Sequence, residues 1–255
     1  MSITFEQYIQ NPMGRANAVF SNREMYRTMY MEKLDKIMVR EHGKVDYKLF
    51  IKGKTYYCYI KIPSETIEDF YYDVVIEFTE PEGKTPKTLD KYEARFYSND
   101  PSFVFTFAHA FIENDMFITS LTDKMSKEAV KKVAVEKNPQ NQVGYVKSLF
   151  FAYLIMSKRG LFNKLQYTLA FKASFLKGLI TNADIKVEQR IEAGKAKEEK
   201  KKTIRQKIKQ AARDAMAPEI PIKQNNVVRR TPTVSRIGKS SSIKKTGTVK
   251  RTKRI

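Results

Sequence analysis

The sequence has few of the residues that close disulfides or bind zinc. It contains one cysteine, Cys58, and two histidines, His42 and His109. One cysteine closes no intramolecular disulfide, and with two histidines it does not complete a four-ligand zinc site. We therefore expect a reducing compartment. Cys58 lies within the segment TYYCYIKI, which favours a small buried hydrophobe over a nucleophile.

Catalytic and cofactor motifs are missing as well. The chain has no GxSxG, no SxxK, no Walker A sequence and no GxGxxG. The two histidines stand singly, His109 in an aromatic stretch and His42 beside a glycine, so we expect neither to be a ligand or a base. The sequence thus predicts a protein that is not an enzyme and that holds no cofactor and no metal.

One catalytic alternative stays open, a metal-dependent nuclease, because such sites need only carboxylates and a lysine on adjacent strands. Asp73, Glu77 and Glu93 fall on two expected strands. The sequence Glu93-Ala94-Arg95 differs by one substitution from the acidic-x-Lys pair of restriction-like nucleases. The departure counts against catalysis, because arginine keeps its proton where lysine can lose it. Acidic residues alternating with apolar ones are also typical of the solvated face of a sheet.

Long apolar runs are absent. The longest strongly apolar stretch without charge is Leu149 to Met156, eight residues, whereas a membrane-spanning helix needs about 18 or more. The opening MSITFEQYIQNP has neither a basic segment nor an apolar core of the kind found in secretion signals. We expect a soluble protein without a secretion signal.

Positive charge is what the sequence has in excess. Its 255 residues carry 48 Lys and Arg against 28 Asp and Glu, a net charge of +20. Residues 184–255 hold 22 basic and 7 acidic residues, a net of +15, whereas residues 1–183 hold 26 and 21, a net of +5. The excess is therefore concentrated in the C-terminal part, and such concentration is typical of segments that bind polyanions.

This C-terminal part divides in two. Residues 184–217 are rich in Ala, Glu, Lys, Arg and Gln with no proline, which predicts a long charged helix. Residues 218–255 have no aromatics and one acidic residue, Glu219, so alone they cannot bury enough apolar surface to become ordered. We call residues 218–255 the basic arm, and we expect it to be disordered or ordered by a partner.

The basic arm is the predicted nucleic-acid-binding segment. Small polar residues separate its cations, which lets an extended chain follow a phosphate backbone and release counterions. Without aromatics it has no platform for stacking single-stranded bases, so backbone binding to duplex DNA, RNA or a structured assembly of them is favoured, with duplex DNA as the first candidate. A solubilising tail or a targeting signal is the main alternative; membrane binding is disfavoured because bulky apolar anchors are missing. The predicted contact residues are Lys223, Arg229, Arg230, Arg236, Lys239, Lys244, Lys245, Lys250, Arg251, Lys253 and Arg254.

Residues 1–183 predict an α+β domain, a small antiparallel β-meander packed by helices. The period-2 segments 45–51, 55–62, 71–79 and 91–97 indicate four strands, the first two joined through Lys52-Gly53-Lys54 as a hairpin. Helical spacing indicates helices over residues 3–10, 22–41, 123–133, 141–159 and 161–180, and Asp100-Pro101 begins another. The run LFFAYLIM predicts that the helix over 141–159 is the central core helix.

Three blocks carry a resemblance. The opening MSITFEQYIQNPMGRANAVFSNREMYRTMY, the strand block FYYDVVIEF and the helix block VGYVKSLFFAYLIMSKRGLF resemble a structural protein of tailed bacteriophages. The resemblance covers residues 1–180 and implies a virion component at the head or neck, made in the host cytoplasm before assembly. Its implied partners are other virion structural proteins, present in multiple copies, and it assigns no catalytic or binding residues.

These observations together favour a non-enzymatic structural component of a large nucleoprotein assembly, with the basic arm on nucleic acid or between subunits. Two further alternatives remain at this stage. One is a free nucleic-acid-binding factor in packaging, replication or ribosome association. The other is a scaffold whose arm binds acidic protein.

Overall fold

A computed structural model describes residues 3–10, 23–83, 85–134 and 136–215. Contacts within the chain divide it into two units, residues 1–208 and residues 209–255. The first unit is an α+β domain, as the sequence predicts. The basic arm, with all eleven predicted contact residues, lies outside the described residues.

The sheet is the predicted meander with one strand added. Its order is β4-β3-β2-β1-β5, and the first four strands are antiparallel neighbours. Gly53 turns the hairpin between β1 and β2 at φ +59°, a conformation that glycine adopts without steric cost. The fifth strand, which the sequence did not predict, pairs in parallel with β1. The strands are β1 (Tyr47–Lys52), β2 (Thr55–Pro63), β3 (Tyr71–Thr79), β4 (Glu93–Ser98) and β5 (Leu169–Ala170).

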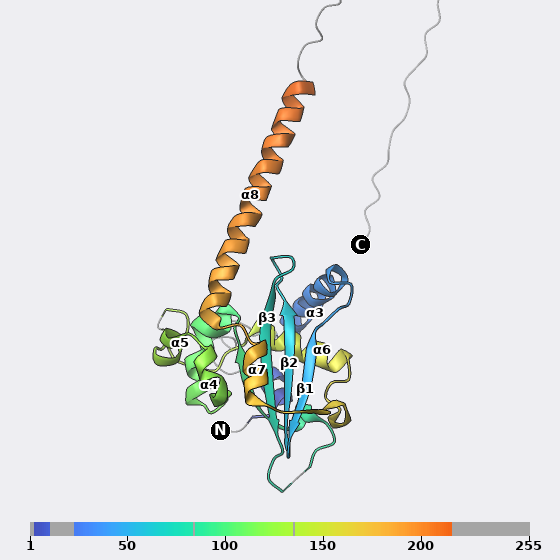
Figure 1. Cartoon of the computed structure of the whole chain (residues 1–255), viewed down its shortest axis with the longest axis vertical. Coiled ribbons are helices and arrows are strands. Elements are labelled where there is room, and N and C mark those ends of the chain that lie inside the picture. The colour runs from blue at the N-terminus through green and yellow to red at the C-terminus, as the bar shows by residue number, and fades with distance from the viewer. Residues whose placement is uncertain (1–2, 11–22, 84, 135, 216–255) are drawn as a thin grey trace, which may run out of the picture. The chain divides into compact units, whose positions relative to one another are not determined.

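One face of the sheet forms the main core. Side chains alternate across a strand, so the register places Cys58, Ile76 and Phe96 side by side on this face. Helices α1 (Phe5–Gln10), α3 (Arg23–Arg40) and α6 (Lys147–Lys158) cover it, and α6 lies behind the sheet in Figure 1. Phe5 of α1 is fully buried, with its ring 5.1 Å from that of Phe96.

The opposite face carries Tyr57, Tyr59 and Tyr97 and is covered by the chain that follows α6. Phe171 stacks on Tyr57 at 3.9 Å between ring centroids, and α7 (Ala173–Leu179) lies in front of the strands in Figure 1. The hydroxyl of Tyr97 donates to the carbonyl of Lys124 in the 3-10 segment Thr119–Lys124. Both faces of the sheet are therefore packed, which explains why its strands contain so many apolar residues.

The predicted core helix is confirmed but begins later than expected. In α6 every residue from Leu149 to Met156 except Tyr153 is buried. The helix starts at Lys147 rather than Asn141, because Val146 is extended and its amide is bonded to Tyr8. The Tyr8 hydroxyl donates to the carbonyl of Gly144 at 2.9 Å and accepts from the amide of Val146 at 3.1 Å.

The prediction of one helix over residues 161–180 is wrong. After Gly160, at φ +66°, the chain forms a 3-10 turn, then β5, and only then α7. Tyr167 is buried against Tyr56, and Phe171 stacks on Tyr57, so both aromatic side chains are used to cover the sheet. These contacts favour an extended path over local helix propensity. The predicted helix over 123–133 is also shorter, with α5 at Lys127–Lys131.

Two further helical predictions agree with the structure. The segment after Asp100 is helical through Glu113, with a π-helical turn at Phe103–Phe107 followed by α4 (Ala108–Glu113). The long charged helix is α8 (Ala183–Ala215). In the described part of the chain, no helix has the length and apolar character needed to cross a membrane.

Candidate nucleic-acid interface

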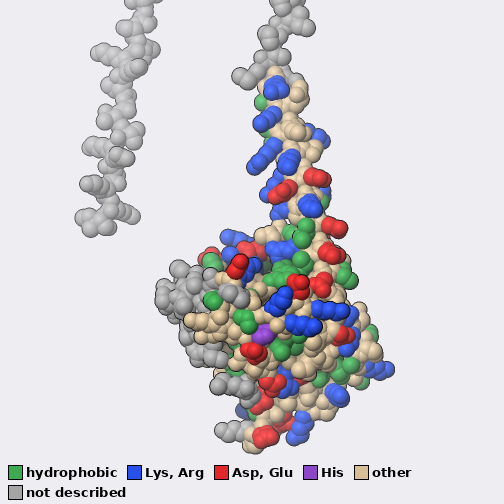
Figure 2. Space-filling model, turned by 90° about the vertical axis from the view of Figure 1, so that its left-hand side faces the viewer, with side chains coloured by type: hydrophobic (Ala, Val, Ile, Leu, Met, Phe, Trp, Pro, Cys, Tyr) green, Lys and Arg blue, Asp and Glu red, His purple; other side chains and the backbone are tan. Residues whose placement is uncertain are grey.

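The most basic exposed surface in the described residues lies on α8. Every residue from Lys195 to Ile208 is exposed, and we call residues 197–208 the exposed α8 segment. Six Lys and Arg and two Glu occupy this segment, and Ile204 and Ile208 are 56% and 63% exposed. Figure 2 shows Lys and Arg side chains along the helix. A helix that is polar on nearly every side remains free for a charged partner.

The root of α8 is firmly attached to the domain, which gives the exposed α8 segment a defined starting point. Arg190 donates to the hydroxyl of Tyr72 at 2.5 Å, and the ammonium of Lys186 lies 4.5 Å from the centre of the Phe70 ring. About two turns further on, Lys197 donates to the backbone carbonyl of Thr66. These contacts tie the first four turns of α8 to β3 and to the loop that precedes it.

A buried carboxylate fixes the chain just before α8. Asp73 is 3% exposed and accepts three hydrogen bonds, from the hydroxyl of Tyr59 at 2.9 Å, the amide nitrogen of Asn99 at 2.8 Å and the backbone amide of Thr181 at 2.9 Å. The backbone amide of Asp73 in turn donates to the side-chain oxygen of Asn99 at 2.8 Å. Burial, together with the charge of Asp73, raises the pKa of Tyr59, so this hydroxyl stays protonated and donates.

The start of α8 has its own cap beside this network. The side chain of Asn182 accepts from the amide of Asp184 at 2.9 Å, which satisfies one of the free N–H groups of the first turn. The Asp73 network thus holds the connection between α7 and α8 against β3, and Asn182 determines where α8 begins.

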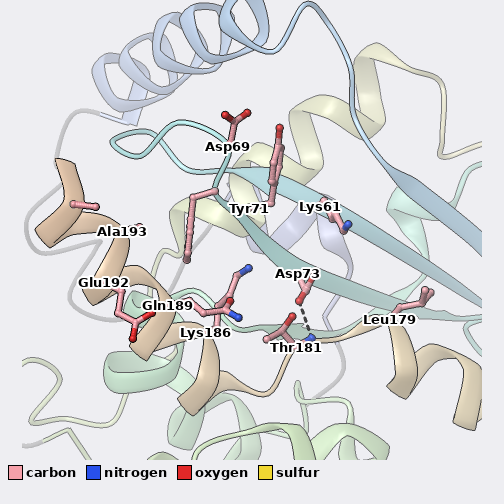
Figure 3. A pocket seen from close by; sticks show the side chains of 12 residues that line it. Lys61, Asp69, Tyr71, Asp73, Leu179, Thr181, Lys186, Gln189, Glu192 and Ala193 are labelled. Carbon is pink, nitrogen blue, oxygen red and sulfur yellow. Dashed lines mark hydrogen bonds between the residues drawn. The ribbon is translucent and has the colours of Figure 1, made fainter. Parts of the chain in front are cut away.

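A cleft of about 580 Å³ separates the α8 root from β2 and β3 (Figure 3). Lys61 and Lys186 line it together with the carboxylates of Asp69, Asp73 and Glu192. Burial lowers the pKa of Lys186, and the charge of Asp73 opposes this shift. Because carboxylates and ammonium groups share the cleft, it does not concentrate positive charge, and the basic surface begins only further along α8.

The carboxylates of the nuclease alternative are not brought together. Asp73 and Glu77 are four residues apart on β3, about 13 Å along a strand, and Glu93 lies opposite Thr79, about 20 Å from Asp73. Asp73 is engaged in the network above. Within the residues that the structure describes, no group of three or more His, Cys, Asp or Glu could hold a metal ion.

Two other residues of that alternative, Glu77 and Arg95, take part in an ion-pair cluster at the surface. Arg95 lies 3.4 Å from the Glu77 carboxylate and 2.8 Å from that of Asp115. Hydrogen bonds from Arg95 to Asp115 raise the pKa of the guanidinium, against the effect of partial burial. Arg95 therefore serves as a fixed cation between two carboxylates, as its high pKa predicts.

Cys58 is buried, as the sequence predicts, and burial raises the pKa of its thiol to about 12. Such a thiol is protonated and unreactive at neutral pH. His109 lies within 2.9 Å of the side-chain amide of Asn141, and His42 lies in the turn after α3 with φ +52°, beside Gly43. Sequence reasoning missed the role of Asp73 as an anchor; the signal available was a single acidic residue within the stretch YYDVVI.

Comparison of the chain with protein-family models, with curated proteins and with solved structures finds no match.

Proposed function

We propose that this protein is a non-enzymatic structural component of a large nucleoprotein assembly, and that α8 and the basic arm contact the nucleic-acid backbone. The observation that carries the proposal is the exposed α8 segment, where six cations and two carboxylates stand on a helix whose root is bonded to the domain. The basic arm adds eleven basic residues further along the chain. The α+β domain then provides the surface that docks on partner protein.

Backbone contact suits this surface better than base recognition. The twelve residues of the exposed α8 segment extend about 18 Å along a helix axis, and duplex DNA presents a phosphate charge about every 1.7 Å of its own axis. The segment carries no aromatic side chain for stacking on bases. Binding is therefore expected to be insensitive to sequence, to prefer duplex DNA and to weaken steeply with salt.

The assembly that we favour is the virion of a tailed bacteriophage, at the head or neck. This part of the proposal rests on the resemblance of residues 1–180 to a virion structural protein. Mass spectrometry of purified particles, run beside the soluble lysate of the same culture, tests it directly. We expect the full chain in the particles; its presence in the lysate alone would instead favour a free nucleic-acid-binding factor.

Replacing Lys200, Lys201 and Lys202 by glutamine tests the contribution of α8. We expect affinity for a 30-base-pair duplex to fall about tenfold at 0.1 M salt, and the slope of log K against log salt to become shallower by about 2, because fewer counterions are released. Fluorescence anisotropy titrations at several salt concentrations measure both quantities.

The matched control makes the same charge change on the domain, at three exposed lysines of or beside α5: Lys127, Lys131 and Lys132. This variant should bind within twofold of the unmodified protein. Equal losses in the two triple variants would mean that only net charge matters, and the proposal that α8 forms part of the interface would then be abandoned.

A further inference from the structure

The two edges of the sheet differ. On the outer side of β4, Thr4 forms a bridge with Glu93, and Phe117 forms one with Phe96, so this edge is partly covered. On the other side the sheet ends at β5, which has only two residues. Edge strands of folded proteins expose backbone N–H and C=O groups that can pair with another chain. The β5 edge is therefore the one to consider as an interaction surface.

The backbone of β5 presents one outward-facing residue. Phe171 donates its amide to the carbonyl of Ile51 at 3.0 Å, and the register pairs Leu169 with Phe50 and Ala170 with Ile51. Backbone groups of successive residues in a strand point to opposite sides. Leu169 and Phe171 therefore face β1, and the N–H and C=O of Ala170 face away from the sheet.

A groove with apolar walls lies beside this edge. It has a volume of about 560 Å³, and the side chains of Tyr47, Leu169 and Phe175 on its walls are 38%, 46% and 46% exposed. Residues 47–49 of β1 line it and have no partner on β5, whose register reaches only Phe50 and Ile51. Backbone groups and apolar side chains thus occur together, as they do where a peptide adds a strand to a sheet.

The charge of the residues that line the groove indicates which kind of segment binds in it. Lys48 and Lys172 line it and no acidic residue does; the Lys48 ammonium lies 5.0 Å from the centre of the Phe175 ring. The basic arm, with eleven basic residues and one acidic residue, would be repelled. A second copy would place the same lysines opposite each other, which is unfavourable.

We propose that an extended segment of a partner protein, with acidic residues alternating with apolar ones, pairs with β5 and fills this groove. The proposal rests on the proposed function, because it identifies the surface by which the domain docks within the assembly. Backbone bonds to Ala170 align the segment, and its apolar side chains contact Leu169 and Phe175. Its acidic side chains point to the other face of the added strand, where alternation along the extended chain also places Lys172.

Two peptides of identical composition test the proposal on the full chain. The probe is VEVDIEVD, with alternating acidic and apolar residues, and the control is EDEDVVIV, with the acidic residues grouped. Both carry the same charge, and the grouped carboxylates of the control bind a polycation such as α8 or the basic arm at least as well as the spaced ones, so tighter binding of the alternating peptide does not come from charge alone. We expect the alternating peptide to bind at least tenfold more tightly, as measured by fluorescence anisotropy with labelled peptides.

Two variants of Ala170 locate the binding. Ala170→Pro removes the outward N–H but leaves the bonds to β1, and it should abolish the preference for the alternating peptide. Ala170→Val keeps the N–H and should retain the preference. If circular dichroism shows that Ala170→Pro is unfolded, the double variant Lys48→Glu with Lys172→Glu is used in its place. This double variant should also lose the preference for the alternating peptide.

Equal binding of the two peptides by the unmodified protein would overturn the proposal, as would a preference that survives in the proline or double-glutamate variant. Concentration-dependent dimerisation that Ala170→Pro abolishes would also overturn it, because a second copy would then be the occupant. DNA binding by the Ala170 variants should be unchanged. Equal binding of the two peptides by the unmodified protein, with DNA binding intact, would overturn this proposal alone, whereas an absence of DNA binding would overturn the proposed function.

Discussion

Replacing Asp73 by alanine is expected to lower the free energy of unfolding by about 4 kcal/mol. The carboxylate is 3% exposed and accepts hydrogen bonds from Tyr59, Asn99 and the backbone of Thr181. Alanine would leave these donors facing a cavity. Tyr59 and Asn99 have alternative acceptors in the carbonyls of Leu179 and Thr181, but the structure gives the Thr181 amide no other acceptor.

Replacing Asp73 by asparagine tests the contribution of its hydrogen bonds without opening a cavity. The side chain has nearly the same volume, but one acceptor oxygen becomes an NH₂ group that faces other donors. We expect Asp73→Asn to cost about 2 kcal/mol, less than alanine because no cavity forms. Urea denaturation followed by circular dichroism gives all of these free energies.

Glu192→Ala is the matched control, because Glu192 lines the same cleft as Asp73 but is exposed and has no such network. It should change stability by less than about 0.5 kcal/mol. If Asp73→Ala cost no more than Glu192→Ala, the network would not be what anchors α8, and the attachment would have to come from Lys186, Arg190 and Lys197.

The four strands of the meander could be predicted because their signal is local. Alternating β-branched and aromatic residues, together with Gly53 at a tight turn, indicate a hairpin without knowledge of the rest of the chain. The long helix α8 could be predicted for a similar reason, since its composition is helix-forming over more than thirty residues. The exposed basic surface of α8 follows from the same composition, because the Lys, Arg and Glu side chains that dominate residues 197–208 are rarely buried.

The failures come from contacts between residues distant in sequence. Local propensity favours a helix over 161–180, but Tyr167 and Phe171 pack on Tyr56 and Tyr57, more than a hundred residues earlier. Asp73 has the pattern of a solvated carboxylate and is instead buried by Asn99 and Thr181. Neither the aromatic packing nor the partners of Asp73 can be recognised from the residues adjacent in sequence. The same reason explains why β5, and with it the groove at its edge, could not be predicted.

Gly144→Ala is expected to destabilise the domain by about 3 kcal/mol, because a side chain at this position has no space. A Cβ atom would lie 2.1 Å from Cε1 of the Phe107 ring and 2.6 Å from Cζ. Phe107 is 8% exposed, so its ring cannot simply turn into solvent. The backbone of Gly144 is also held in place, since its carbonyl accepts from the buried hydroxyl of Tyr8.

A double-mutant cycle with Phe107→Ala identifies the contact responsible. Removing the ring costs stability by itself, but it also makes room for the new methyl group, so the double variant should be at least 1 kcal/mol more stable than the sum of the single effects predicts. Gly194→Ala in α8 is the control, because nothing lies within 4 Å of its Cβ position, and it should be neutral or slightly stabilising. Additive effects of Gly144→Ala and Phe107→Ala would mean that the glycine is required by its backbone and not by the aromatic ring beside it.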